Sequence, residues 1–420
     1  MRWFVIMMLF LLGTASAHAW QPHLSGDANA PQTLLAVDKK NQNFLIFSNR
    51  SPLRQEQAWQ CTTGKVQGDK LVEGDFKTPE GVYFLEKMIY GEHLPFDLYG
   101  KMAFTLNYPN PVDRINQKTG HSIWIHGRGK KVIPNDTEGC VAMDMEYMLA
   151  LENMVDLGKT PVIIADNLSW EPAETASENS RKIVEKSFQW AREWQRKSDK
   201  YFDYYDPVLF AESSGLDFNR FMTHKKKLFR QYPWMDVYTE KPRVIKGPDY
   251  WVSYFGQVFK APGFYSVGVK RLYWKHSDKG VFKIVGEEWR SYPKDSLEQK
   301  YLATRKDELQ KVINQWKKSW LRADIEEYSE FYYHNARQDN LKGLQAITAH
   351  KRDIWGRGLL PEAIDFGEIR ISSTDQGYKA EFLQKYENRT GYSDYGLKTL
   401  IMIPFEGDWL IKSETWSEIS

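Results

Sequence analysis

The sequence predicts a β-rich N-terminal domain followed by two copies of one α+β domain. Short apolar runs separated by turn residues fill residues 32–166, which is the pattern of short strands. A small, acidic and proline-containing segment at 170–180 is typical of a linker. The remaining chain repeats itself at an offset of 126–128 residues, which predicts a tandem domain duplication rather than a short-period solenoid.

In the first block, alternating apolar runs predict strands near residues 33–37, 43–47 and 161–164. The run before His126 predicts a further strand that ends at this histidine. A helix is expected to start near Met143 and Asp144, directly after Cys140. The first domain is therefore predicted to be mostly β, with few helices.

The two later blocks share an amphipathic helix that carries two tryptophans four residues apart. Strand-like runs ending in Glu-x-Trp close each block, and helices leading into a curved antiparallel sheet make an α+β domain. The repeated residues are Trp190 and Trp316, Trp194 and Trp320, His224 and His350, Gly268 and Gly396, and Glu287 and Glu414. Each copy resembles the nuclear-transport-factor-2-like (NTF2-like) cone, in which helices close one side of a bent sheet around a pocket. The recurring histidines are interpreted as structural.

The N-terminus has the features of a secretory signal peptide. Arg2 precedes an apolar run from Trp3 to Leu12, and small residues at Ala15, Ala17 and Ala19 suit cleavage. The run is shorter than the roughly 20 apolar residues that span a bilayer. We therefore expect a signal peptide at 1–19, periplasmic export and no stable membrane span. The other expected boundaries are a first domain at 32–167, a linker at 168–184, and α+β domains at 185–292 and 305–420.

Composition narrows the classes of function. The chain is 42% apolar and 27% charged with a net charge of +2, so a soluble globular protein is expected, and no basic surface for nucleic acid is indicated. No metal-binding motif and no cofactor-binding motif is present, so neither a metal nor a cofactor is expected. The two cysteines, Cys61 and Cys140, allow two interpretations in an exported protein: a structural disulfide, or a catalytic thiol.

The pattern around Cys140 favours the catalytic interpretation. His126-Gly127 follows strand-like residues, and Thr137-Glu138-Gly139-Cys140 follows after a loop rich in glycine and lysine. A thiol beside an imidazole and a helix N-terminus has its thiolate stabilised. Because a free thiol titrates near ~8.5, it needs such a base to react at neutral pH.

This arrangement resembles the signature of the L,D-transpeptidase catalytic domain (YkuD-type β-sandwich), and the segments 62–65 and 75–83 resemble further elements of that family in the expected order. The resemblance implies that Cys140 is the nucleophile, that His126 is the base, and that the Gly127 carbonyl holds the imidazole. It also implies that Gly139 contributes to an oxyanion hole, with Thr137 and Glu138 beside the substrate. The substrates would be peptidoglycan stem peptides, with a lipoprotein or a glycan as a further partner.

Two positions depart from the family pattern. Many members have histidine and arginine where this chain has Glu138 and Ala142, which removes positive charge from the substrate region. Together with appended NTF2-like domains, this is similar to the branch of cell-shape L,D-carboxypeptidases. The sequence therefore predicts an L,D-transpeptidase or L,D-carboxypeptidase of cell wall biogenesis, with a slight preference for hydrolysis. The alternative is a non-catalytic glycan-binding protein with a Cys61–Cys140 disulfide.

Overall fold

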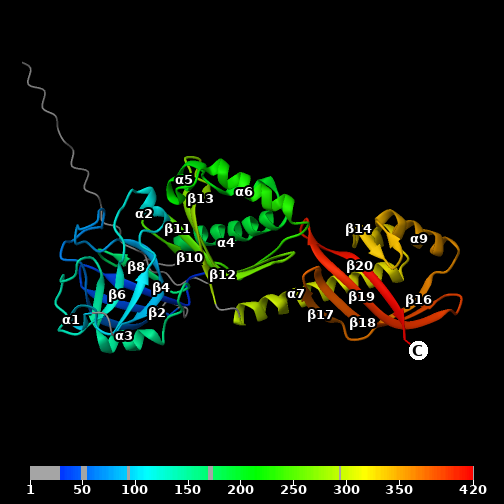
Figure 1. Cartoon of the computed structure of the whole chain (residues 1–420), viewed down its shortest axis with the longest axis horizontal. Helices are drawn as coiled ribbons and strands as arrows, with labels where there is room; N and C mark the ends of the chain where they lie inside the picture. The colour runs from blue at the N-terminus through cyan, green and yellow to red at the C-terminus, as the bar shows by residue number, and fades with distance from the viewer. Residues whose placement is uncertain (1–28, 49–53, 92–94, 169–173, 293–294, 420) are drawn as a thin grey trace, which may run out of the picture.

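The computed structural model describes residues 29–48, 54–91, 95–168, 174–292 and 295–419. The chain forms three bodies arranged in a row, with the barrel at one end and the two α+β domains following it (Figure 1). The predicted fold class is confirmed. The expected signal peptide lies outside the described residues, and across the described residues no helix combines the length and apolar composition needed to cross a bilayer.

The first domain is a closed barrel with the strand order β1-β2-β3-β7-β6-β5-β4-β8. Its strands are β1 (Thr33–Asp38), β2 (Asn43–Ser48), β3 (Arg54–Thr62), β4 (Gly81–Tyr90), β5 (Met102–Leu106), β6 (Trp124–Arg128), β7 (Val141–Asp144) and β8 (Pro161–Ala165). Three helices are attached to it, namely α1 (Phe96–Tyr99), α2 (Pro111–Ile115) and α3 (Met145–Glu152). The strands predicted near 33–37, 43–47 and 161–164 are present as β1, β2 and β8. Inward side chains such as Phe44, Tyr83 and Phe104 fill the barrel core.

The structure differs in two details from the expectations around the candidate site. The helix expected near Met143 and Asp144 is present as α3, which begins at Met145, but strand β7 separates it from Cys140. Val141 and Met143 alternate into the barrel core, and this burial favours a strand over a helix at these positions. Likewise, His126 lies in the middle of β6 and not at its end.

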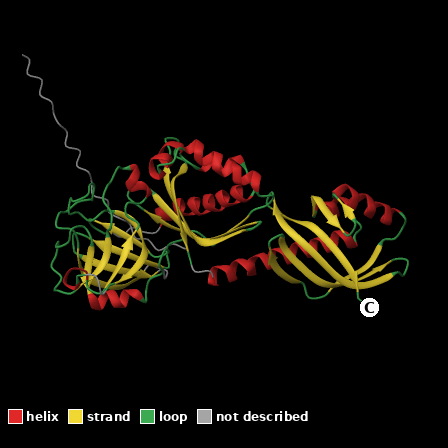
Figure 2. Cartoon of the chain, viewed as in Figure 1, coloured by secondary structure: helices red, strands yellow, loops and turns green. Residues whose placement is uncertain are grey.

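The second body has helices on one face of a curved sheet (Figure 2). Its sheet has the order β10-β11-β12-β13, with β9 also paired to β11. The elements are α4 (Glu174–Gln195), the 3₁₀ helix η1 (Asp199–Tyr204), α5 (Pro207–Ser214), α6 (Phe218–Gln231), β9 (Asp236–Thr239), β10 (Arg243–Lys246), β11 (Trp251–Ala261), β12 (Phe264–His276) and β13 (Phe282–Ser291). Because α4 begins at Glu174, it includes much of the segment whose composition suggested a linker.

The third body repeats this architecture with the sheet order β15-β14-β20-β19-β18-β16, and β17 pairs with β18. Its elements are α7 (Asp295–Leu321), α8 (Ile325–Glu330), β14 (Tyr332–Gln338), β15 (Leu341–Lys342), α9 (Leu344–Gly356), β16 (Pro361–Phe366), β17 (Arg370–Thr374), β18 (Gly377–Asn388), β19 (Ser393–Phe405) and β20 (Asp408–Glu418). The tryptophan pairs lie on α4 and α7, in matching places of the two copies. Their indole rings are 5.4 Å apart in each copy.

The barrel and the second body share one apolar core. Side chains of β1, β4 and β8 on the outside of the barrel pack against side chains of β11 and β12 in a single buried cluster. Polar contacts cross the same interface: the Tyr250 hydroxyl accepts from the Val82 amide at 2.9 Å, and Arg271 pairs with Glu86 at 2.5 Å. The first α+β domain is therefore an integral support of the barrel.

Candidate active site

Strands β6 and β7 bring His126 and Cys140 together. The strands run parallel, with Ile125 opposite Val141 and His126 opposite Ala142. Cys140 directly precedes β7, two residues before Ala142. Because side chains alternate along a strand, Cys140 and His126 are expected to project from the same side of this strand pair, at neighbouring positions.

His126 is held in a defined orientation. Its ring is only 3% exposed, and Nδ1 donates to the Gly127 carbonyl at 2.8 Å. A carbonyl oxygen only accepts, so Nδ1 carries the proton and Nε2 keeps its lone pair. The pKa of His126 is lowered to about 4, mainly by burial and also by the charge of Arg128, against the opposing effect of the Gly127 hydrogen bond. The ring is therefore neutral at neutral pH and can accept a proton.

Cys140 is a partly exposed free thiol. Its Sγ lies 3.6 Å from the Ser122 carbonyl oxygen. Burial raises the pKa of Cys140 to about 11, although the Trp124 amide and the charge of Lys70 favour the thiolate. The thiol is thus protonated in the free protein, and its reaction needs a base. Cys61 is also free and is fully buried on β3, so the structure contradicts the disulfide interpretation.

The turn before Cys140 is organised by Thr137. The Thr137 hydroxyl donates to the Cys140 carbonyl at 2.6 Å and accepts from the Gly139 amide at 3.2 Å. Gly139 has a φ of +130°, and a Cβ there would lie 2.8 Å from the Lys77 carbonyl oxygen. Only glycine fits this conformation without strain. The Glu138 side chain is exposed to solvent, and its carboxylate lies 3.9 Å from the Lys65 ammonium.

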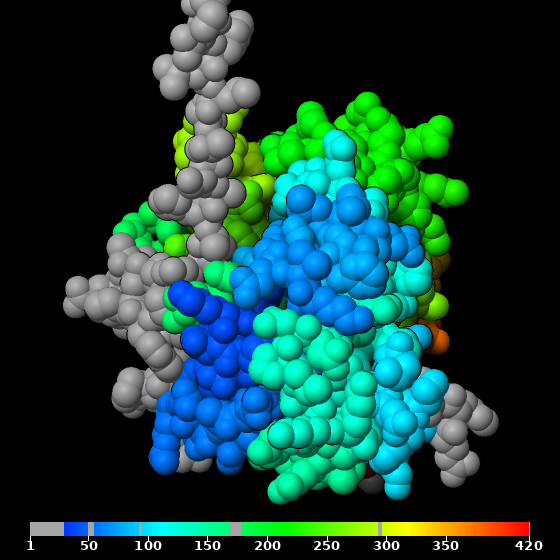
Figure 3. All heavy atoms as spheres, turned by 90° about the vertical axis from the view of Figure 1, so that its left-hand side faces the viewer, coloured from blue at the N-terminus to red at the C-terminus, as the bar shows by residue number. Residues whose placement is uncertain are grey.

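The loop at residues 64–80 lies beside this turn. The Lys65 amide donates to the Thr137 carbonyl at 2.9 Å. In the loop, buried Lys70 pairs with Asp75 at 2.8 Å, and Asp75 also accepts from the amides of Leu71, Val72 and Lys77. The space-filling view onto this end of the molecule shows mainly residues of the first domain (Figure 3).

Two further residues lie near the site, Tyr99 and Lys70, and neither could be predicted from the sequence. Tyr99, at the end of α1, lies with its ring 4.9 Å from the His126 ring and 5.7 Å from Trp124. Burial raises the pKa of Tyr99, and the charges of Cys140 and Glu138 add to this effect. Lys70 is the other residue. In the sequence, the segment 75–83 stood out only by its resemblance to a family element, and nothing indicated Lys70 as the partner of Asp75.

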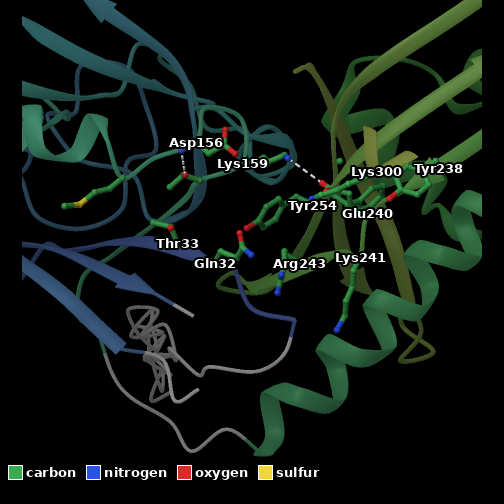
Figure 4. Close-up of a pocket in the computed structure, with 14 residues that line it drawn as sticks. Gln32, Thr33, Asp156, Lys159, Tyr238, Glu240, Lys241, Arg243, Tyr254 and Lys300 are labelled. Carbon is green, nitrogen blue, oxygen red and sulfur yellow. Dashed lines mark hydrogen bonds and ion pairs between the residues drawn. The ribbon is translucent and has the colours of Figure 1, made fainter. Parts of the chain in front are cut away.

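A separate cavity of about 440 Å³ lies where the barrel meets the two α+β domains. Its charged lining side chains include a paired group: Glu240 contacts Lys159 at 3.5 Å and Lys300 at 2.8 Å (Figure 4). Cys140 and His126 are not among the residues that line it.

Comparison with known proteins agrees with this geometry. Residues 32–164 match the L,D-transpeptidase catalytic domain (YkuD), and residues 182–288 and 308–415 each match the Cds6 C-terminal NTF2-like domain. The chain therefore contains a YkuD L,D-transpeptidase catalytic domain. It carries two Cds6-type NTF2-like domains in addition to the catalytic domain, as the sequence repeat predicted. The family acts on peptidoglycan.

Several solved structures are similar to this chain. The structure of Bdellovibrio bacteriovorus Bd1075 is 27% identical, with a TM-score of 0.51, and the match covers 66% of this chain and 98% of that one. The helical cell shape determining protein Pgp2 from Campylobacter jejuni is 24% identical, with a TM-score of 0.49, over 64% of this chain and 95% of that one. A comparison with curated proteins gives no match.

Proposed function

We propose that this protein is a periplasmic enzyme that cleaves L,D-peptide bonds of peptidoglycan stem peptides through a thioester on Cys140. The observation that carries the proposal is the 2.8 Å bond from His126 Nδ1 to the Gly127 carbonyl, which presents a neutral, proton-accepting imidazole beside a protonated thiol. This combination is what a thiol nucleophile with a general base requires.

In the proposed first step, Cys140 Sγ attacks the carbonyl carbon at the L-centre of the third stem residue while its proton passes to His126 Nε2. The oxygen of the tetrahedral intermediate accepts a hydrogen bond from the Cys140 amide. Since the Gly139 amide already donates to Thr137, Gly139 contributes by allowing close approach of the substrate. The intermediate collapses when His126 returns the proton to the leaving amine, and a thioester remains.

The thioester then passes its acyl group to water or to an amine. An amine must compete with water at roughly 55 M, which requires a subsite that orients it and excludes solvent. Exposed Glu138 and small Ala142 replace the positive groups of many family members, which favours hydrolysis. We therefore propose an L,D-carboxypeptidase that releases D-alanine from tetrapeptide stems, with transfer to a diaminopimelate or lipoprotein amine as the alternative outcome.

Incubation of the purified protein with a disaccharide-tetrapeptide tests both steps. Cys140→Ala should abolish turnover without unfolding the protein, whereas the matched Cys61→Ala should retain it, because Cys61 lies in the barrel core and not at the site. Tripeptide without dimer is the expected product. Accumulation of 3-3 dimers would show transfer, and full activity of Cys140→Ala would exclude the thioester.

A further inference from the structure

Tyr250 of the first NTF2-like domain places its hydroxyl against the backbone of the catalytic barrel. It directly precedes β11, and only 4% of it is exposed. Its hydroxyl accepts hydrogen bonds from the Val82 amide at 2.9 Å and from the Asn110 side chain at 3.3 Å. Asn110 also donates to the Val82 carbonyl at 3.1 Å. Both barrel residues are fully buried, so water does not compete for these contacts.

This contact lies at the exit of the 64–80 loop. Gly81 and Val82 follow the loop in the chain and begin β4. Gly81 has a φ of +150°, and a Cβ there would lie 2.9 Å from the Tyr250 hydroxyl. A glycine is required where the chain takes this conformation and another group approaches so closely. The end of the loop is therefore fitted directly against a side chain of the neighbouring domain.

A second connection runs through buried polar residues of the barrel. Asn110 caps α2, and its backbone amide donates to Asp113 at 3.0 Å. Lys118 pairs with Asp113 at 3.0 Å and with Asp69 at 2.7 Å. Asp69 in turn accepts from the Glu80 amide at 2.8 Å. This network links the asparagine at the domain boundary to two residues of the loop.

The loop in turn holds the turn that carries the nucleophile. The Lys65 amide donates to the Thr137 carbonyl at 2.9 Å. The Lys77 carbonyl oxygen lies so close to Gly139 that a Cβ there would be 2.8 Å away. Because Gly139 precedes Cys140, a displacement of the loop moves the backbone beside the sulfur.

We propose that Tyr250 is a positioning residue for the reaction at Cys140. Through its hydroxyl, the first NTF2-like domain holds the 64–80 loop, and the loop holds the nucleophile in place. A misplacement of about 1 Å at reacting groups can cost roughly 10²-fold in rate, so a contact of this kind affects catalysis without touching the substrate. The catalytic part of this inference rests on the proposed function.

The second NTF2-like domain supplies an internal comparison. Gln257 of β11 and Gln384 of β18 each pair with a glycine of the following strand, which sets an offset of 384 − 257 = 127 residues between the copies. The same offset places Gly377 at the position of Tyr250. Among the described residues, the core cluster of the second copy includes none from the barrel. The tyrosine is thus present in the copy that packs on the barrel and absent from the other.

Tyr250→Phe tests the proposal because it keeps the ring and removes only the hydroxyl. Hydrogen exchange of the full chain is the first measurement. We expect the hydrogen-bonded amides of residues 64–80 to exchange at least roughly tenfold faster, while those of β2 and β3 keep the wild-type rate. Tyr83→Phe should have the same local effect, because the Tyr83 hydroxyl donates to the Glu80 carbonyl at 3.2 Å at the end of the same loop.

Turnover of the disaccharide-tetrapeptide is the second measurement. In Tyr250→Phe, kcat should fall at least roughly tenfold, because a misplaced thiol slows acylation. KM should change less than about twofold, because the groups that bind the stem peptide remain. A loss of folded protein would instead lower the concentration of active enzyme, which titration of the Cys140 thiol detects.

Tyr254→Phe is the matched control. Tyr254 is also buried on β11 and packs against Phe84 of the barrel, with ring centroids 5.2 Å apart, but its hydroxyl makes no hydrogen bond to the described residues. This variant should keep wild-type loop exchange, kcat and KM. An equal loss in Tyr254→Phe would overturn the proposal, because it would show that any change at the interface has this effect.

Three results for Tyr250→Phe would also overturn the proposal: unchanged exchange in the loop, equally faster exchange throughout the barrel, or faster loop exchange with unchanged kcat. Hydrogen exchange needs no turnover, so the two proposals fail in different ways. A wild-type protein that does not hydrolyse the tetrapeptide would overturn the proposed function and the catalytic part of this inference. Normal wild-type turnover with unchanged loop exchange in Tyr250→Phe would overturn this inference alone.

Discussion

The His126 ring and the Cys140 thiol are both neutral in the free protein, because burial disfavours the charged form of each. Under the proposed function His126 would act as a base that accepts the proton of a neutral thiol, in contrast to a preformed thiolate–imidazolium pair. Gly139 contributes through its backbone, since its φ of +130° and the nearby Lys77 carbonyl leave no room for a side chain.

The first prediction concerns the pH dependence of acylation. His126 must be neutral to act as the base, and it is neutral above its pKa of about 4. The value of kcat/KM should therefore stay nearly constant from pH 8 to about pH 5 and fall as the pH decreases through about 4. A pH–rate profile with tetrapeptide substrate measures this.

His126→Ala serves as the control, and it should lose roughly 10²–10⁴-fold in acylation rate together with the acidic limb of the profile. An acidic limb centred near the ordinary imidazole pKa of about 6.5 would contradict the prediction.

At the scale of elements, the 64–80 loop is the part of the barrel that sets the position of the nucleophile. Asp75 holds the turn at 71–77. The pKa of this carboxyl is lowered to about 2. Burial opposes the shift, and the hydrogen bonds from Lys70 and three backbone amides produce it. The Lys77 carbonyl at the end of this turn packs on Gly139. Lys70 thus acts on Cys140 through its charge and through the loop it holds.

Substitutions at the Lys70–Asp75 pair test this role. Lys70→Met should raise the pKa of Cys140 and so slow alkylation of the thiol at pH 8, and Lys70→Arg should restore the rate. Asp75→Asn should speed hydrogen exchange at the amides of residues 71–77. Because a lowered carboxyl pKa stabilises the folded state above about pH 4, the difference in unfolding free energy between wild type and Asp75→Asn should shrink as the pH falls from 4 through 2.

Exposed Lys40→Met provides a matched loss of charge, and it should change neither the alkylation rate nor the exchange. An unchanged alkylation rate in Lys70→Met would show that Lys70 does not influence the Cys140 thiol.

On the scale of the whole molecule, the catalytic barrel and the first NTF2-like domain are joined by a core and not by a flexible tether. The shared cluster includes side chains from both domains, and buried Arg271 contacts Glu86 and the Gly158 carbonyl across the boundary. Within its own domain Arg271 also contacts Glu288. A separated catalytic domain would expose this apolar face to water.

We expect a fragment of residues 29–168 to have a thermal midpoint at least roughly 10 °C below that of a fragment of residues 29–292, because several kcal/mol of apolar burial are lost. Differential scanning calorimetry and gel filtration measure this, and the shorter fragment should also aggregate. Arg271→Met in the full chain is a milder test. Among the described residues it leaves Arg290 as the remaining ion-pair partner of Glu86, and it should lower the midpoint. A monomeric short fragment with an unchanged midpoint would show that the barrel is autonomous.

Much of this organisation could be predicted from the sequence. Strong local patterns indicated the strands near 33–37, 43–47 and 161–164, and recurring tryptophans indicated the duplication. The order of the motifs around His126 and Cys140 indicated the site. Local patterns did not predict the strand between Cys140 and α3, since the burial of Val141 and Met143 depends on their partners in β6 and β3.

Tyr99, Lys70 and Arg271 were missed for the same physical reason. Each acts through neighbours that are distant in sequence, and a single tyrosine, lysine or arginine has no periodicity that would reveal those neighbours. Only the folded chain shows that Tyr99 covers His126 and that Lys70 lies close enough to influence Cys140.

The two cysteines differ in accessibility, so Cys140 can be labelled selectively in the unmodified protein. Cys61 is fully enclosed by the barrel, and burial raises the pKa of its thiol well above the ordinary range, so electrophilic dyes have access to Cys140 alone. One fluorescent label per folded molecule therefore counts active sites, without removal of any residue. The same label, applied to intact cells, would show where the protein resides. If the proposed function is correct, it would also show how much of the protein carries an acyl group at a given moment of growth.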